Sequence, residues 1–315
     1  MMQQTPPAPS LIDNLGDGYR ALNRRPLLVL LPIAFNLYLW FGTQISFAPL
    51  VRDLAGFVER SQPIDASRDQ NTIDTLTAFG QLDMRQPLAI LNSVPTLPVA
   101  QIVGLMGNTS QAIQIDSIWM ALLIGIAINI VVLPLTAGFL TRMVDAVHNE
   151  RRPWSEALRT AVRVGLSIAG VVAILVAVGA ALLLPFFVFS AILMTLNQAI
   201  GIFALSLMVL AVFWVQIYLG FATEAIAVGG LNPLRAIQAS FRIVRRNFWA
   251  TLGLLGISYI ISTGGAVIWR MLVGSTVGLI IAIIGSAYIG CGLQAARMLF
   301  FQERLQRLQK PQQRL

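Results

Sequence analysis

The side chains that enzymes and metal sites commonly use are scarce in this sequence. It contains one histidine, His148, and one cysteine, Cys291. A zinc site is built from several Cys, His or acidic ligands, and these two residues alone cannot supply one. No phosphate-binding loop and no dinucleotide-binding glycine pattern occurs. We therefore expect no enzyme active site, no metal and no cofactor, with His148 an ordinary surface residue and Cys291 a small packing residue.

Polar side chains inside apolar segments are the first candidates for a functional site. Asn36, Asn129 and Gln216 lie in segments without charges, and together they form a candidate intramembrane polar cluster. Hydrogen bonds between helices, worth about 0.6 kcal/mol each, are the first interpretation, and a polar permeation path is the alternative. Coupling to protons or cations usually needs ionisable groups in mid-membrane. None lies in the middle of these segments, which disfavours such coupling.

A row of arginines in the segment 233–246 is the second candidate. With about 100° of turn per residue, one side of this helix holds Arg235, Arg242 and Arg246, with Arg245 at its border. The other side holds Leu234, Ile237, Phe241, Val244 and Phe248. Such a helix rests in a membrane interface, so the three arginines are candidate lipid-headgroup contacts, with anionic lipids as ligands. A solvated basic face that only fixes topology is the simpler interpretation. We expect the preceding Glu224 to pair with Arg235 or Arg242.

Composition indicates what positions these groups. Of the 315 residues, 56% are hydrophobic and only 11% are charged, against about 25% charged in a soluble domain. The chain is therefore expected to be embedded in a membrane. Its net charge of +8 would fit a nucleic-acid partner, but the basic residues follow the positive-inside rule of membrane proteins. We expect no nucleic acid.

Charge-free windows predict the membrane helices. Because a span needs about 20 residues, the window 164–223 is too long for one helix, which would reach about 90 Å. It must turn back near 195–198. The predicted fold class is all-α, a polytopic membrane protein with six transmembrane helices near 27–47, 118–140, 165–189, 200–222, 248–269 and 275–297.

The remaining segments complete the predicted domain organisation. Residues 1–10 are read as a disordered tail, 11–301 as the six-span membrane domain, and 302–315 as a basic cytosolic tail. With the N-terminus in the cytosol, 17 of the 22 basic residues lie inside, which favours both termini in the cytosol. The extracytoplasmic insertion 49–116 contains an apolar, proline-broken stretch, 88–106, expected to be re-entrant or interfacial.

Amphipathic cytosolic helices are predicted before each hairpin of spans, at 11–25, 153–163 and 233–246. Three positions of the second helix match the third at an offset of 79 residues: Ala157, Leu158 and Arg163 correspond to Ala236, Ile237 and Arg242. Two spans per unit preserve the orientation of each unit in the membrane. The sequence therefore predicts a parallel repeat about the membrane normal.

Small residues recur every four positions on two predicted spans. The third span carries Gly165, Ala169 and Ala173, and the sixth carries Gly274, Gly278 and Ala282. Such stripes let helix backbones approach closely. Packing within the chain is the first interpretation, and a homo-oligomer face is the alternative.

The stretch 224–255 resembles a bacterial multi-pass family that includes the membrane domain of glycerophosphoryl diester phosphodiesterases and the YciC-like proteins. The matching residues are Glu224, Gly229, Gly230, Pro233, Ala236, Ile237, Ser240, Phe248 and Trp249. The likeness covers roughly 118–300, and its motif is architectural. The phosphodiesterase activity of some relatives belongs to a separate domain that this chain lacks, and the insertion 49–116 departs from the family pattern.

Together these features favour a non-enzymatic scaffold or membrane-homeostasis protein in the bacterial cytoplasmic membrane. A transporter or channel for a neutral or lipidic solute is the alternative, and an intramembrane enzyme comes third. The expected partners are the lipid bilayer, with its anionic lipids, and a second copy or another membrane protein. A water-filled cavity lined by Asn36, Asn129 and Gln216 would favour transport, and a closed bundle would favour the scaffold.

Overall fold

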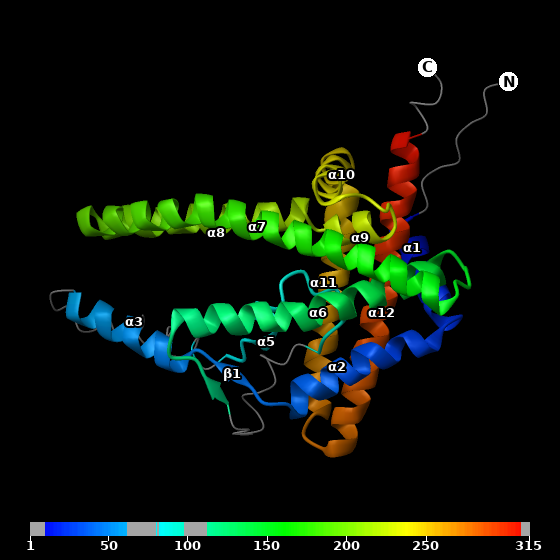
Figure 1. Cartoon of the computed structure of the whole chain (residues 1–315), viewed down its shortest axis with the longest axis horizontal. Coiled ribbons are helices and arrows are strands. Elements are labelled where there is room, and N and C mark those ends of the chain that lie inside the picture. The colour runs from blue at the N-terminus through cyan, green and yellow to red at the C-terminus, as the bar shows by residue number, and fades with distance from the viewer. Residues whose placement is uncertain (1–9, 62–79, 81, 98–111, 310–315) are drawn as a thin grey trace. The chain divides into compact units, whose positions relative to one another are not determined.

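The computed structural model describes residues 10–61, 80, 82–97 and 112–309, and nearly all of them are helical (Figure 1). Five helical stretches are long and apolar enough to cross a membrane. They are α6 (Ile118–Val147), α7 (Trp154–Leu196), α8 (Gln198–Tyr218) with α9 (Ala222–Ala227), α11 (Phe248–Leu272) and α12 (Thr276–Gln309). The protein is therefore an all-α, multi-pass membrane protein, as the composition predicts.

The first expected span, 27–47, forms a shorter helix. A 3-10 turn, η1 (Pro26–Val29), leads into α2 (Leu30–Phe41), and the chain is extended from Gly42 onward. Twelve residues of α-helix rise only about 18 Å, against about 30 Å of hydrocarbon. The described chain thus has five full-length stretches and one short apolar helix where six spans were expected.

A buried ion pair explains where α2 ends. The guanidinium of Arg85 lies 2.7 Å from the carboxylate of Asp83, and Arg85 also donates to the carbonyl oxygens of Tyr38 and Leu39. Those carbonyls belong to the last turn of α2, where N–H partners from a following turn are lacking; the Tyr38 oxygen also accepts from the N–H of Gly42 (2.8 Å). An arginine far along the sequence therefore satisfies the C-terminus of this helix.

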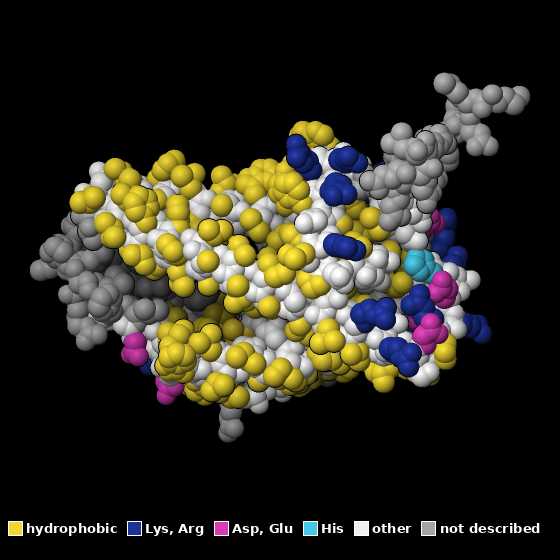
Figure 2. Space-filling model, turned by 45° about the horizontal axis from the view of Figure 1, so that its top comes forward, with side chains coloured by type: hydrophobic (Ala, Val, Ile, Leu, Met, Phe, Trp, Pro, Cys, Tyr) yellow, Lys and Arg dark blue, Asp and Glu magenta, His cyan; other side chains and the backbone are white. Residues whose placement is uncertain are grey.

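The long charge-free window reverses at Asn197, within the predicted turn 195–198. The side chain of Asn197 accepts hydrogen bonds from the N–H groups of Ala199 (2.9 Å) and Ile200 (3.4 Å) and so caps α8. The expected amphipathic helix 153–163 is continuous with the third span, which makes α7 a single helix of 43 residues. Apolar side chains cover the α7–α8 hairpin around its turn, and the basic side chains gather toward the other end (Figure 2).

The chain divides into two compact units. The first contains Met1–Leu28, Thr136–Ile261 and Cys291–Leu315, and the second contains Val29–Leu135 and Ser262–Gly290. Each unit has its own buried contacts.

In the first unit, α1 (Leu11–Asn23) packs directly on the backbone of α12. A Cβ added to Gly18 would lie 2.6 Å from the amide nitrogen of Ala296 and 2.8 Å from the carbonyl oxygen of Gly292. The ring of Tyr19 lies against Gly292 as well. The predicted amphipathic helix 11–25 therefore packs one face on protein, with Asn14, Gly18, Ala21 and Leu22 buried.

A similar close approach joins α10 (Pro233–Arg246) to α7. A Cβ on Gly170 would lie 2.6 Å from Cγ of Pro233, so only glycine lets the start of α10 sit this near. The buried side of α10 consists of Ala236, Ser240, Ile243 and Val244. Because side chains at these spacings share one face of a helix, α10 has a protein-facing side.

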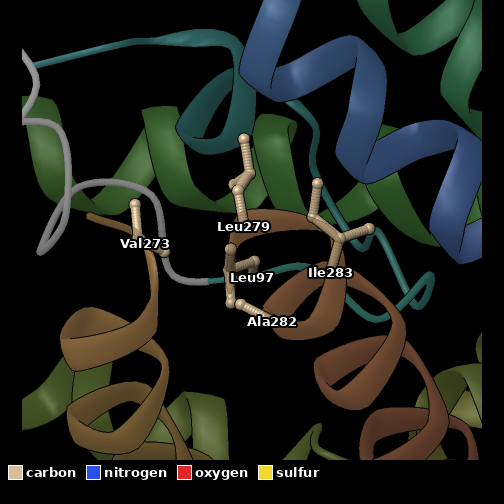
Figure 3. Close-up of a cluster of buried hydrophobic side chains, with 5 residues drawn as sticks. All are labelled: Leu97, Val273, Leu279, Ala282 and Ile283. Atoms are coloured by element: carbon tan, nitrogen blue, oxygen red, sulfur yellow. The ribbon is translucent and has the colours of Figure 1, made fainter. Parts of the chain in front are cut away.

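In the second unit, a non-helical segment packs among helices. The apolar stretch 88–106 follows the single turn α5 (Arg85–Leu88), and its described part, up to residue 97, is irregular. Residues 98–106 lie outside the described residues. Leu97 is buried in a cluster with Val273, Leu279, Ala282 and Ile283 (Figure 3).

The two ends of the insertion 49–116 meet in the same unit. After α2, the strand β1 (Ile45–Ser46) pairs in parallel with β2 (Ile113–Gln114), and helix α3 (Ala48–Ser61) follows β1. Ile45 is buried with Met84, Ile115 and Ala121. This two-residue ladder is the one β-sheet among the described residues.

The predicted small-residue stripes lie in mixed surroundings. On α7, Gly165 faces Cβ of Ala137, Ala169 is half-buried and Ala173 is exposed. In the second unit, Gly274 is exposed in the turn between α11 and α12, whereas Gly278 is buried against the preceding turn of its own chain. Ala282 belongs to the buried cluster around Leu97.

The contact between α1 and α12 can be tested with two neighbouring glycines. Gly18→Ala should destabilise the protein by about 1–3 kcal/mol, because its methyl group would meet backbone atoms that cannot move aside. Gly16→Ala, on the same helix with nothing within 4 Å of the added carbon, should instead stabilise by about 0.5–1 kcal/mol through helix propensity. Thermal unfolding of the full chain in mild detergent measures both; equal shifts would contradict this packing.

Candidate functional site

The junction between α8 and α9 is where buried polar groups gather in the first unit. The chain leaves helix after Tyr218, so backbone groups there need other partners. Ser240 of α10 supplies two: its hydroxyl donates to the carbonyl oxygen of Tyr218 (2.7 Å) and accepts from the N–H of Phe221 (3.2 Å). Ser240 is fully buried. This serine therefore ties the amphipathic helix α10 to the break in the membrane span.

Glu224 in α9 is fully buried at the same junction. Its Oε1 lies 2.9 Å from Nε of Arg297 and 3.3 Å from Nε2 of Gln294, and its Oε2 accepts from the hydroxyl of Thr223 (2.9 Å). Both oxygens thus have partners. A buried carboxylate needs such pairing because water no longer solvates it.

The partner of Glu224 comes from α12, so the expected pairing with Arg235 or Arg242 is wrong. Both of those arginines are exposed on α10, whose opposite, buried side faces the protein. Helix periodicity could not reveal Arg297, because it lies 73 positions further along the chain. A sequence window around α10 offers only the nearer arginines.

Arg297 makes further contacts that fix its position. It donates to the carbonyl oxygen of Gly220, and its guanidinium carbon lies 5.6 Å from the ring centroid of Phe221. The Phe221 ring in turn stacks on Phe300, with the centroids 5.6 Å apart. The guanidinium therefore serves the carboxylate, a free carbonyl and an aromatic face together.

Carboxylates paired with arginine recur with the period of the predicted repeat. Asp145, at the end of α6, Glu224, and Glu303, near the end of α12, are separated by 79 residues each. Asp145 is fully buried and has Nη1 of Arg142 and Nε of Arg152 each at 3.3 Å. These acids were not predicted as a set, although they follow the same 79-residue offset that relates the amphipathic helices.

The third acid of this set lies in a more open position. Glu303 is 2.8 Å from Nη2 of Arg307 and 3.4 Å from Nη1 of Arg304. Each repeat unit therefore ends its second span with a carboxylate paired to arginine. The chemistry that this arrangement supports is structural ion pairing, because every one of these carboxylates is in contact with a guanidinium.

The predicted polar cluster serves a different purpose. Asn36 accepts a hydrogen bond from the N–H of Leu97 (2.6 Å) and donates to the carbonyl oxygen of Pro95 (3.1 Å). Asn129 donates to the carbonyl oxygen of Leu88 (2.7 Å) and accepts from the N–H of Ile90 (3.2 Å). Both amides hold the backbone of the proline-broken segment, which is irregular after Leu88.

Gln216 is not part of that arrangement. It belongs to the first unit and is exposed on α8, whereas Asn36 and Asn129 are in the second. Two of the three predicted residues, Asn36 and Asn129, thus bond to the backbone of the same segment, 88–97. Spacing along the sequence did not indicate this, because the partners are backbone groups.

The predicted headgroup contacts on α10 are all exposed. Arg235, Arg242 and Arg246 make no ion pair with any described residue. Arg242 and Arg246 line an open groove, and Arg245, placed at the border by the sequence, joins them there. Arg235 does not line this groove.

The residues that could bind a metal are dispersed in the described part of the chain. No group of three or more His, Cys, Asp or Glu side chains capable of holding an ion occurs there. Cys291 is buried in α12 as expected of a packing residue, and His148 is half-buried in the turn after α6.

The ion pair at the α8–α9 junction can be tested by removing one charge. Glu224→Gln should destabilise the protein by about 3–5 kcal/mol, because Arg297 would keep its charge without a partner. Asp17→Asn, which breaks the exposed pair with Arg20, should cost at most about 1 kcal/mol. Adding Arg297→Gln to the first variant should recover part of the loss. Unfolding in detergent that shows no difference between the two single variants would refute the buried pair.

Comparison with known proteins places the chain in a family. The family model described as a domain of unknown function, DUF7847, matches residues 10–302. No curated protein and no solved structure matches the chain. The resemblance to the glycerophosphodiesterase membrane domain and the YciC-like proteins therefore stays a prediction. Because the matched residues make up far more than half of the sequence, this multi-pass membrane protein belongs to the DUF7847 family.

Proposed function

We propose that this protein is a non-enzymatic scaffold or membrane-homeostasis protein of the bacterial cytoplasmic membrane. One observation carries the proposal. Asn36 and Asn129, the amides that a solute path would use, are each bonded to backbone of the segment 88–97. Polar groups engaged in this way are not available to replace the hydration of a passing solute.

The buried ion pairs of the described residues support the same proposal. Glu224 contacts Arg297, and Asp83 contacts Arg85. Intramembrane ionisable groups mark transport paths when they face a water-filled cavity, whereas these pairs are buried and stabilise helix ends. The acidic and basic side chains thus favour a fixed assembly over a conducting one.

The orientation follows from the basic residues. With both termini in the cytosol, 17 of 22 lysines and arginines lie on the inner side. The exposed arginines of α10 then meet the anionic inner leaflet, where each contributes about 1 kcal/mol before screening by salt. Anionic lipids are accordingly the proposed lipid partners, and a second copy or another membrane protein is the proposed protein partner.

Reconstitution tests the scaffold against the alternative, a transporter for a neutral or lipidic solute. Proteoliposomes that contain the full chain should swell in glycerol no faster than empty liposomes, and should exchange fluorescent phospholipid between leaflets no faster. The reason is that the mid-membrane amides are occupied by backbone. A glycerol or lipid flux above the empty control that Asn129→Leu abolishes would instead establish the transporter.

Thiol labelling in intact cells tests the orientation. Gln114→Cys, at an exposed position on the expected outer side, should react with an impermeant maleimide, and Arg151→Cys, exposed on the expected inner side, should not. The native Cys291 is buried and gives the unlabelled control. Labelling at 151 without labelling at 114 would reverse the topology.

A further inference from the structure

A groove on α10 combines arginines with apolar side chains. Its volume is about 750 Å³. It is lined by Leu219, Ile237, Gln238, Phe241, Arg242, Arg245 and Arg246. Phe241 is 46% exposed, with one face of its ring stacked on Tyr218 at 4.8 Å between centroids. Figure 2 shows dark-blue side chains directly beside yellow ones over this helix. The groove therefore offers positive charge and uncovered apolar surface side by side.

A second groove of the same character lies on the cytosolic end of α7. Its volume is about 400 Å³. It is lined by Arg159, Val162, Arg163, Leu166, Ser167 and Pro233. Val162 is 56% exposed and Leu166 is 70% exposed. The close contact of Pro233 with Gly170 forms one wall, so this groove is built by the docking of α10 on α7.

The two grooves occupy equivalent places in the internal repeat. Val162 and Arg163 of the first correspond, at the 79-residue offset, to Phe241 and Arg242 of the second. In each groove an arginine therefore adjoins a large apolar side chain at the same position of the amphipathic helix.

Several other arginines of the first unit already have a carboxylate partner. Arg142, Arg152, Arg297 and Arg304 each contact a carboxylate. No described carboxylate pairs with Arg163, Arg242 or Arg245. A planar guanidinium binds phosphate oxygens in a bidentate manner. The unpaired arginines are thus free to hold an external phosphate.

We propose that the two grooves are discrete binding sites for anionic phospholipids, one lipid in each. The phosphodiester would bind Arg159 and Arg163 in one groove and Arg242, Arg245 and Arg246 in the other. The acyl chains would cover the exposed apolar side chains, which a soluble phosphate would leave uncovered; this favours a lipid as the occupant. The inference rests on the proposed function, because it needs both helices at the inner leaflet.

Lipid counting tests the proposal. The full chain is placed in phosphatidylcholine nanodiscs doped with phosphatidylglycerol, and the lipids retained after release from the disc are counted by native mass spectrometry. The parent should retain two phosphatidylglycerols. Arg159→Gln with Arg163→Gln should retain one, Arg242→Gln with Arg245→Gln should retain one, and all four substitutions together should retain none.

Arg235→Gln is the matched control, because Arg235 is an exposed arginine of α10 outside both grooves. It should keep two bound lipids. A loss equal to that of the groove variants would mean diffuse attraction by the whole basic face and would overturn the discrete sites. Retention of no phosphatidylglycerol by the parent would also overturn them.

Competition with soluble glycerol phosphate shows whether the grooves bind a lipid or a free phosphate. If it displaces both lipids at millimolar concentration, the grooves bind a soluble phosphate and the lipid assignment is wrong; if it displaces neither, the acyl chain is part of the ligand. A failure of the proposed function would be seen elsewhere, as solute or lipid flux in proteoliposomes, and lipid retention by the grooves would be unaffected by that result.

Discussion

A membrane interior has no water, so every backbone N–H and C=O that leaves a helix there must find a partner in the protein. Three breaks in this chain show the same solution. Arg85 bonds the last carbonyls of α2, Asn36 and Asn129 bond the irregular segment 88–97, and Ser240 bonds both sides of the α8–α9 junction. Each donor or acceptor comes from a distant part of the sequence. These few polar side chains therefore determine where helices end and which elements are held together.

The same constraint divides the charged residues into two groups. Glu224 and Asp145 are buried and each contacts at least one arginine within 3.3 Å, since an unpaired buried charge is too costly to keep. These pairs recur every 79 residues and close each repeat unit at its second span. The remaining arginines of α7 and α10 have no acidic partner among the described residues. Pairing thus distinguishes the arginines that stabilise the fold from those that remain free to meet a ligand.

Much of the architecture could be predicted from the sequence because it depends on local composition. Hydrophobic windows located the long helices, and the length of the window 164–223 required the reversal that Asn197 provides. Contacts between distant residues could not be predicted in this way. The early end of α2 depends on Arg85, and the partner of Glu224 is Arg297, which lies in another helix. Asn36 and Asn129 were identified as functional candidates, but their partners are backbone atoms, which leave no pattern in a sequence.

Helix α10 shows why a pattern of one apolar and one polar side was not sufficient to predict which of its residues are buried. An interfacial helix in a lipid layer needs one apolar and one polar side, but α10 also packs on protein and so has a third. Ala236, Ser240, Ile243 and Val244 are buried, whereas Leu234 and Phe241, predicted to belong to the same apolar side, are exposed. The exposed apolar edge lies between the buried side and the arginines. That position places guanidinium groups next to uncovered hydrocarbon, which is the combination that a phospholipid, with its anionic head and apolar chains, can satisfy.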